Sequence, residues 1–213
     1  MGESPVDGRT ERWREHRVQR RREFVEAAMR ALEKYGPDVS VAQIAAEAGV
    51  AKPRLYRHFA DKADLLAGVQ RHLSELLWQR LSVALDPTDE PEHLVRTSLE
   101  AFLGVVDEHP SAYRLMLLPS ALTPSTAERV VAGRKIGEVL SSLIAGQLRT
   151  LGADVDTAEP YGHALAGAVG AATLWWLETR AISKDALVDR MVPPILGALS
   201  GITASADGQL RRA

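Results

Sequence analysis

Apolar residues recur every three or four positions along almost the whole chain, and this spacing constrains the fold more than any other feature of the sequence. A period of 3.6 residues places such side chains on one face of a helix, whereas strict alternation would indicate a strand. No stretch combines alternation with β-branched or aromatic enrichment, so no sheet is expected. The sequence therefore predicts an all-α protein of about nine helices.

Glycine and proline mark the ends of the predicted helices. Gly36-Pro37 ends a first helix, whose apolar stripe runs from Val18 to Tyr35. Pro91 opens another helix, which ends before His109-Pro110 because the residue before a proline avoids the helical region. The other helical segments are expected at about 62–85, 113–117, 123–148, 157–180 and 184–203, with a kink at Pro193-Pro194.

Composition excludes several classes of protein. The 213 residues are 46% hydrophobic, enough for a sizeable core, and contain no cysteine. A disulfide framework, a catalytic thiolate and a cysteine metal site are thereby excluded. The amino-terminal residues lack the apolar core of a secretory signal, and the uncharged stretch 160–177 is too short and too weakly apolar to predict a membrane span. We expect a cytoplasmic protein without a membrane partner.

Charge is distributed unevenly along the chain. Residues 1–62 carry 13 Lys and Arg against 10 Asp and Glu, whereas residues 63–213 carry 13 against 18. The basic part is thus at the front of the chain. We divide the chain into a basic amino-terminal domain (1–62), a helical carboxy-terminal domain (63–205) and a loose tail (206–213).

Residues 40–65, SVAQIAAEAGVAKPRLYRHFADKADL, predict two short helices joined by a tight turn. Ser40 and Gln43 have the spacing of a capping box, which starts the first helix. Gly49 provides the backbone freedom that the turn needs. The inward face of this first helix is expected to consist of Ile44, Ala45 and Ala48.

The second helix of this segment is short and basic. Pro53 suits its first turn, and Leu55 and Phe59, four residues apart, are expected to anchor it inward. Asp61 and Asp64 are spaced to cap the following helix. Helix-turn-helix motifs place such a second helix in the DNA major groove. The alternative from spacing alone is a basic surface helix in an unrelated bundle.

The run IAAEAGVAKPRLYRHFADKADLL resembles the amino-terminal DNA-binding domain of TetR-type transcriptional regulators. The resemblance lies in the IA-x-x-AGV turn, the LY-x-HF recognition helix and the DK-x-x-LL start of the next helix. It implies a three-helix DNA-binding domain, a homodimer that binds a palindromic operator, and release by a small molecule in the larger carboxy-terminal domain. A repressor is the expected function.

The resemblance also implies which residues meet DNA. The positions that match DNA-facing ones are Lys52, Pro53, Arg54, Tyr56, Arg57 and His58, and Lys62 matches a phosphate-contacting lysine. Arg54 departs from the small residue that is usual there, so its contact is argued from chemistry alone. Arginine or lysine donating to guanine O6 and N7 is the commonest base-specific pairing, which suits Arg54 or Lys52.

The remaining candidates for the interface are polar or basic. Tyr56 and His58 are expected to hold phosphates, which set register without reading sequence. Gln43 either contacts DNA or serves only as a cap. One arginine of Arg20–Arg22 is expected to reach a phosphate, and residues 1–12 are either a basic arm or, as we favour, a solvated extension.

A cavity for the effector is expected between the helices of the carboxy-terminal domain, mostly apolar with a few polar groups. Since the stripes there carry few charges, the effector is expected to be apolar or amphipathic, such as a fatty-acid-like or aromatic molecule. Tyr113, His163 and Thr173 could orient it. The candidate lining residues, each of which could instead be plain core, are Trp78, Phe102, Val106, Tyr113, Met116, Leu117, Val139, Leu143, His163 and Trp175 or Trp176.

Small residues fill the segment 161–172, YGHALAGAVGAA, and allow helices to approach closely. The family resemblance implies that the last two long helices pair with their copies as a four-helix bundle. The apolar stripe of the last helix, from Leu187 to Leu199, suits that arrangement. The alternative is close packing inside one subunit.

Two other functions compete with a ligand-gated regulator. A helical enzyme would need a nucleophile with a base, paired carboxylates or a metal set, and the six histidines show no ligand spacing with carboxylates. We therefore expect neither an enzyme nor a metal or other cofactor. An architectural DNA-binding protein without an effector would leave about 150 residues of the chain without a purpose.

Overall fold

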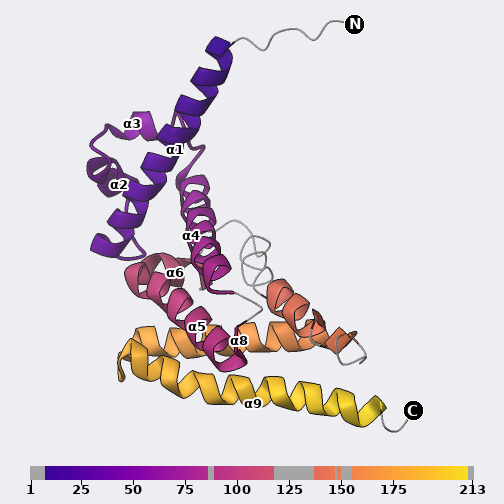
Figure 1. Cartoon of the computed structure of the whole chain (residues 1–213). Helices are drawn as coiled ribbons and strands as arrows, with labels where there is room; N and C mark the ends of the chain where they lie inside the picture. The colour runs from indigo at the N-terminus through magenta and orange to yellow at the C-terminus, as the bar shows by residue number, and fades with distance from the viewer. Residues whose placement is uncertain (1–7, 86–88, 118–136, 147, 150–154, 211–213) are drawn as a thin grey trace, which may run out of the picture. The chain divides into compact units, whose positions relative to one another are not determined.

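The computed structural model describes residues 8–85, 89–117, 137–146, 148–149 and 155–210 (Figure 1). These residues form helices and turns, with no strand among them, so the prediction of an all-α protein is confirmed. Residues 137–146 and 148–149 are helical. The other helices are α1 (Gly8–Tyr35), α2 (Val41–Glu47), α3 (Lys52–Leu55), α4 (Lys62–Ala84), α5 (Pro91–Glu108), α6 (Pro110–Leu117), α8 (Ala158–Thr179) and α9 (Lys184–Leu210).

Most predicted helix ends agree with the structure. Gly36 adopts a φ of 81° directly after α1, and α5 ends at Glu108, before the His109-Pro110 pair. The helix predicted at 123–148 is described only from residue 137, and its first part lies outside the described residues. At the carboxyl end, α9 continues to Leu210, so residues 206–210 are helical rather than a loose tail.

The last helix is longer than predicted because nothing in the sequence stops it. Pro193 and Pro194 lie inside α9, and no proline follows them. An isolated glycine such as Gly201 costs a helix only about 1 kcal/mol relative to alanine. The helix therefore runs on through residues that we had assigned to the tail.

The described residues divide into two compact units. The first comprises the described residues 8–73 and 109–117, so the beginning of α4 and all of α6 belong to it. Helix α1 packs against α2 and α6. The core of this unit is formed by Phe24, Val25, Met29, Leu32, Ile44, Leu55, Phe59, Leu65, Val69 and Leu73. This division differs from the boundary at 62/63 that the charge distribution suggested.

The amino-terminal stripe of α1 is shorter than its periodicity indicates. Val18 is 64% exposed and Tyr35 is 42% exposed, although both were assigned to the apolar face. Buried residues of α1 begin at Phe24 and end at Leu32. The burial stops where the packing against the other helices of the unit stops, so the ends of the stripe remain in solvent.

The second unit comprises the described residues 74–85, 89–108, 137–146, 148–149 and 155–210. Helix α9 packs against both α5 and α8, and an ion pair of 2.6 Å joins Arg96 of α5 to Asp189 of α9. The buried residues of these three helices include Leu99, Leu103, Val106, Trp176, Leu177, Leu187, Val188 and Val192. A smaller apolar cluster joins Ile144 and Leu148 to α8 and α9.

Within the described ranges, no helix has both the length and the apolar character that a membrane crossing requires.

Candidate nucleic-acid interface

The first motif helix, α2, begins at the capping box that the sequence predicts. The backbone amide of Gln43 donates to Ser40 Oγ at 3.2 Å, and Gln43 Oε1 accepts from the Ser40 amide at 2.8 Å. The helix buries Ile44 and Ala45 completely, whereas Ala48 is half-buried. Gln43 thus caps α2, and a contact of its side chain with DNA stays a prediction.

The turn between α2 and α3 depends on Gly49. Its φ of 65° lies in the left-handed region, which favours glycine because a side chain would be strained there. The amide of Gly49 donates to the carbonyl of Ala46, and the amide of Val50 donates to that of Ala45. These bonds close the end of α2 and bring the chain directly into α3.

Helix α3 presents one apolar face inward and a basic face outward. Leu55 and Phe59 are 1% and 2% exposed, as their spacing predicts. Pro53 lies in the first turn, where its missing amide costs no hydrogen bond. The exposed residues of this segment include Lys52, Pro53, Arg54, Tyr56 and Arg57. Five of the predicted interface residues, in α3 and directly after it, are therefore exposed together.

His58 lies differently from the other predicted interface residues. It is half-buried, its ring meets Phe24 of α1 edge to face at 5.1 Å, and its Nδ1 atom is buried without a hydrogen-bond partner. Burial lowers the pKa of His58, and the positive charges of Arg17, Arg21, Arg54 and Arg20 lower it further. A neutral ring packed on α1 is poorly suited to the phosphate contact that we expected.

The start of α4 is capped as the sequence predicts. Asp61 Oδ1 accepts from the amide of Asp64 at 2.8 Å, and Asp64 Oδ2 accepts from the amide of Ala60 at 3.1 Å. Burial opposes the ionisation of Asp64, but hydrogen bonds from Arg21 and Ala60 outweigh it and lower its pKa. Lys62 is the first residue of α4 and is half-buried.

The three consecutive arginines of α1 have different partners. Arg20 pairs with Glu23, and Arg22 pairs with Glu26, both within their own helix. Arg21 instead crosses to the other side of the motif, where it pairs with Asp64 at 2.6 Å. Sequence analysis missed this pair because 43 positions separate the two residues and no local pattern links them.

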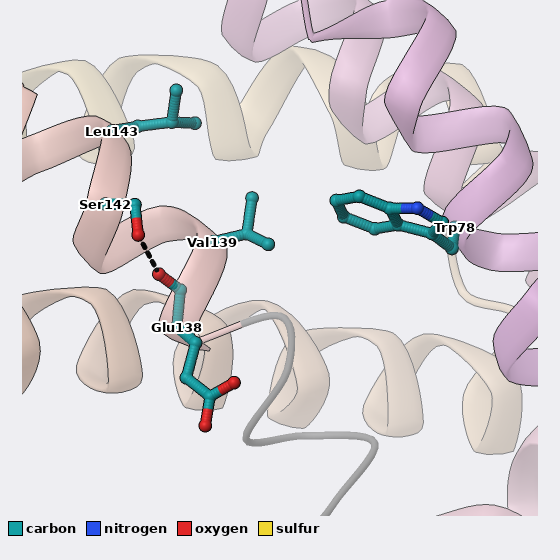
Figure 2. A pocket seen from close by; sticks show the side chains of 5 residues that line it. All are labelled: Trp78, Glu138, Val139, Ser142 and Leu143. Carbon is teal, nitrogen blue, oxygen red and sulfur yellow. Dashed lines mark hydrogen bonds between the residues drawn. The ribbon is translucent and has the colours of Figure 1, made fainter.

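The second unit contains an open hollow of about 390 Å³. Figure 2 shows the indole of Trp78, from α4, facing Val139 of the helical stretch 137–146. Trp78, Val139 and Leu143 are three of the predicted effector-lining residues, and the structure brings them together. Glu138 and Ser142 also line the hollow. Each directly precedes a predicted lining residue, Val139 or Leu143, and this adjacency in the sequence could have identified both.

The other candidates for effector binding lie elsewhere. Phe102 and Val106 are buried in α5, and Trp175 is 45% exposed on α8. Its neighbour Trp176 is buried and donates from Nε1 to the carbonyl of Ile182 at 3.0 Å. Tyr113, Met116 and Leu117 belong to α6 in the first unit, and burial raises the pKa of the Tyr113 phenol.

Two polar residues that we expected to orient an effector have other surroundings. Thr173 is fully buried and donates from Oγ1 to the carbonyl of Val169, within its own helix. His163 is half-buried where α8 approaches Gly137: a Cβ on that glycine would lie 2.2 Å from His163 Nδ1. Both residues therefore serve the packing of α8.

The small residues of α8 divide into a buried one, which packs within the chain, and a set on an exposed face. Gly162 is buried, and a Cβ there would lie 2.3 Å from Ser141 Oγ and 2.4 Å from its backbone nitrogen, so this glycine permits a close helix crossing within the chain. Directly after Gly162, α8 has an exposed face. Ala164, Gly167, Ala168, Ala171 and Trp175 share one exposed face, spaced three or four residues apart.

Comparison with known proteins assigns both parts of the chain to one family. Residues 24–69 match the family described as bacterial regulatory proteins, tetR family. Residues 80–210 match the family described as tetracyclin repressor-like, C-terminal domain. Together these two matches cover the helix-turn-helix segment and nearly all of the second unit.

Individual proteins give the same result. An HTH-type transcriptional regulator of Mycobacterium tuberculosis is 32% identical over 210 residues, which cover 97% of this chain and 88% of the relative. The HTH-type transcriptional activator FasR of Mycolicibacterium smegmatis is 32% identical over 164 residues, 75% of this chain and 73% of the relative. The crystal structure of a tetR-family regulator from Streptomyces coelicolor has a TM-score of 0.75 at 19% identity, covering 92% of this chain and 87% of its own.

Proposed function

Since this chain belongs to the TetR family and is a transcriptional regulator with a helix-turn-helix DNA-binding motif rather than an enzyme, we propose that it is a ligand-responsive repressor. In this proposal a homodimer binds a palindromic operator in the cytoplasm and is released by a small apolar or amphipathic effector. The observation that carries the proposal is the outward row of five exposed residues in α3 and directly after it, anchored by buried Leu55 and Phe59; the row consists of Lys52, Pro53, Arg54, Tyr56 and Arg57.

The side chains of this row support two kinds of DNA contact, one to base edges and one to phosphates. Arg54 and Lys52 lie in the first turn of α3, the part of a recognition helix that meets base edges. Both can donate to guanine O6 and N7. Tyr56, Arg57 and Lys62 follow toward the carboxyl end and the next helix, and we assign them to phosphates, which hold the register.

The homodimer is supported by the exposed small-residue face of α8. A face of Ala164, Gly167, Ala168 and Ala171 beside an exposed Trp175 lets another helix approach closely and offers it an aromatic anchor. Helix α9 packs beside α8 and exposes Pro194, Gly197, Ala198 and Gly201. A second copy of these two helices would complete a four-helix bundle, whose two-fold symmetry matches a palindromic operator.

The effector proposal rests on the hollow at Trp78. Its volume of about 390 Å³ falls within the usual range for small-molecule sites, and its lining combines an indole and two aliphatic side chains with one carboxylate and one hydroxyl. Such a lining suits a molecule with an apolar body and a polar end. Fatty-acid-like and aromatic molecules are the probes to try first.

The relative FasR is named an activator, so the direction of regulation needs its own readout. A repressor blocks transcription from a promoter that overlaps its operator, whereas an activator raises it. Transcription in vitro from a promoter carrying the selected sequence distinguishes the two. Increased transcript with added protein would replace repression by activation and leave the DNA-binding proposal intact.

The experiment that tests the proposal is a selection of random duplex DNA by the purified protein, repeated with a mixture of fatty acids and aromatic molecules. We expect a palindromic consensus, with half-sites about one helical turn apart or a multiple of it, that is lost when the effector is present. A consensus without any ligand response would support an architectural protein or a regulator without an effector.

Salt dependence provides an independent check of DNA binding. A dimer that makes about 6–10 phosphate contacts should lose about 10³–10⁵ in affinity between 50 and 200 mM salt, because each contact releases counterions. Titration of a fluorescent duplex by anisotropy measures this slope. A flat response, together with no enrichment in the selection, would refute the proposed operator binding.

A further inference from the structure

Arg21 makes three contacts with the segment that joins α3 to α4. Its Nη1 donates to the backbone carbonyl of His58, and its Nη2 pairs with Asp64 Oδ1 at 2.6 Å. The plane of its guanidinium also lies over the ring of Phe59, with 4.1 Å between Cζ and the ring centroid. A single side chain of α1 thus holds the end of one helix and the start of the next.

The recognition helix depends on such outside support. Helix α3 spans only four residues, Lys52–Leu55, and one turn is far below the length at which a helix is stable alone. The carbonyls that follow its last turn have no helical donors of their own. Arg21 supplies a charged donor to the carbonyl of His58, three residues beyond the end of α3.

Asp64, the acidic partner of Arg21, is itself held by further hydrogen bonds. The carboxylate of Asp64 accepts hydrogen bonds from Arg21 and from the backbone amide of Ala60. The backbone amide of Asp64 donates to the side chain of Asp61. The side chain of Asp64 therefore links α1 to the turn between α3 and α4. Because a planar guanidinium donates in fixed directions, this arrangement sets the position of that turn relative to α1.

We propose that Arg21 is a positioning residue for DNA recognition: it fixes the carboxyl end of α3 against the start of α4, so that Arg54 and Lys52 meet base edges in register. This inference rests on the proposed operator binding. In this proposal Arg21 acts through α3 rather than on DNA, because its guanidinium already donates to His58 and Asp64 and lies over Phe59. This role replaces the phosphate contact considered for it above.

Positioning and phosphate contact have different signatures. Base-edge hydrogen bonds weaken steeply when donor and acceptor move out of line, whereas the attraction between a cation and the phosphates depends weakly on small displacements. Loss of a positioning residue should therefore reduce the preference for the right sequence. Loss of a phosphate contact should reduce affinity for every sequence and lower the salt slope by about 0.9 for each contact.

The experiment compares five proteins: the wild type, Arg21→Ala, Asp64→Ala, the double variant, and Arg22→Ala. Arg22 is the matched control, since it is the next residue of α1 and pairs only with Glu26 of its own helix. The probes are the duplex that the wild type selects and the same duplex with scrambled half-sites. The readouts are the ratio of the two dissociation constants and the salt slope for the scrambled duplex.

We expect Arg21→Ala to reduce the ratio of the two dissociation constants by about tenfold, and Asp64→Ala to reduce it as well. Because the two residues contact each other, the reduction in the double variant should be smaller than the product of the two single reductions. The salt slope for Arg21→Ala should equal that of the wild type, and Arg22→Ala should keep the wild-type ratio. An unchanged ratio in Arg21→Ala, or a salt slope reduced by about 0.9 or more, would overturn the inference.

Two further results keep the test interpretable. If Arg21→Ala does not fold, as judged by circular dichroism, Arg21→Lys takes its place, because lysine keeps the charge but cannot donate to both acceptors from one plane. A wild-type ratio in Arg21→Lys would then refute the role. If the wild type itself shows no preference between the two duplexes, the proposed operator binding fails instead.

Discussion

Both carboxylate oxygens of Glu33 accept a hydrogen bond from the backbone amide of Ser111, each at 3.1 Å. Oε1 also accepts from the amide of Ala112 at 3.2 Å. These amides open α6, so a side chain of α1 caps a helix that lies 78 positions further along the chain. A charged group satisfying amides at a helix start is favoured by both hydrogen bonding and the helix dipole.

Replacing Glu33 should therefore loosen α6. We expect Glu33→Ala to lower the free energy of unfolding by about 1–2 kcal/mol, the usual effect of removing a helix cap. Urea unfolding measures the loss, and hydrogen exchange at the amides of Ser111 and Ala112 should accelerate first. Glu33→Gln keeps one acceptor and should lose less; equal losses in the two variants would contradict this account.

Replacing Arg54 and replacing Lys62 should have different effects, because Arg54 is assigned to a base and Lys62 to a phosphate. Arg54→Ala is expected to relax preference at one base position, at a cost of about 1–3 kcal/mol, whereas Lys62→Ala should weaken binding to all sequences alike. Selection with each variant, followed by titration of the enriched duplex, checks both. Uniform loss in the two variants would show that Arg54 does not read a base.

Gly162 should tolerate no side chain, because α8 passes so close to Ser141 there. We expect Gly162→Ala to destabilise the protein by about 1–3 kcal/mol, the usual penalty for overpacking. Gly104, in the middle of α5, is the control, since nothing lies within 4 Å of a Cβ built on it. Gly104→Ala should instead stabilise by about 0.5–1 kcal/mol through helix propensity, and thermal unfolding compares the two.

The half-buried ring of His58 predicts a pH dependence of stability. Its pKa in the folded protein lies below the ordinary value of 6.5, so below pH 6.5 the unfolded chain binds more protons than the folded one. Stability should consequently rise with pH up to about 6.5 and then level off for this group. Two-dimensional NMR titration should find the pKa of His58 below 6.5, and His58→Gln should flatten the rise. A His58 pKa at or above 6.5 would refute the argument.

The exposed face of α8 can be tested without DNA. If the proposed homodimer forms through this face, we expect Ala168→Arg to yield a monomer, because a long charged side chain prevents close approach of a second helix. Gln79→Arg, the same new side chain at an exposed position of α4, should leave the dimer intact. Sedimentation velocity measures both; a dimer that survives Ala168→Arg would place the interface on another face.

Local signals explain how much of the interface could be predicted from the sequence. The capping box at Ser40, the cap at Asp61, the glycine turn at position 49 and the spacing of Leu55 and Phe59 each act within a few residues, and all agree with the structure. Burial between distant segments has no such signature. The inward turn of His58 onto Phe24 depends on α1, which lies 34 positions away in the chain.

The effector residues were harder to predict for the same reason. An apolar stripe shows that a residue faces other helices, but whether it borders a hollow or fills a core depends on which helices meet. Trp78, Val139 and Leu143 border the hollow, whereas Phe102 and Val106 have the same periodicity and are simply buried. Similarly, α6 follows α5 directly in sequence, yet its capping by Glu33 groups it with the first unit.

The capping box at the start of α2 also limits what Gln43 can recognise. Its side-chain oxygen already accepts from the amide and the hydroxyl of Ser40, both at 2.8 Å. Only the NH₂ group is left to point outward, so this glutamine has donors to offer and no acceptor. It therefore cannot make the paired contact with the N6 and N7 atoms of adenine that a free glutamine makes. Acceptors, such as phosphate oxygens or a purine N7, are all that it can address.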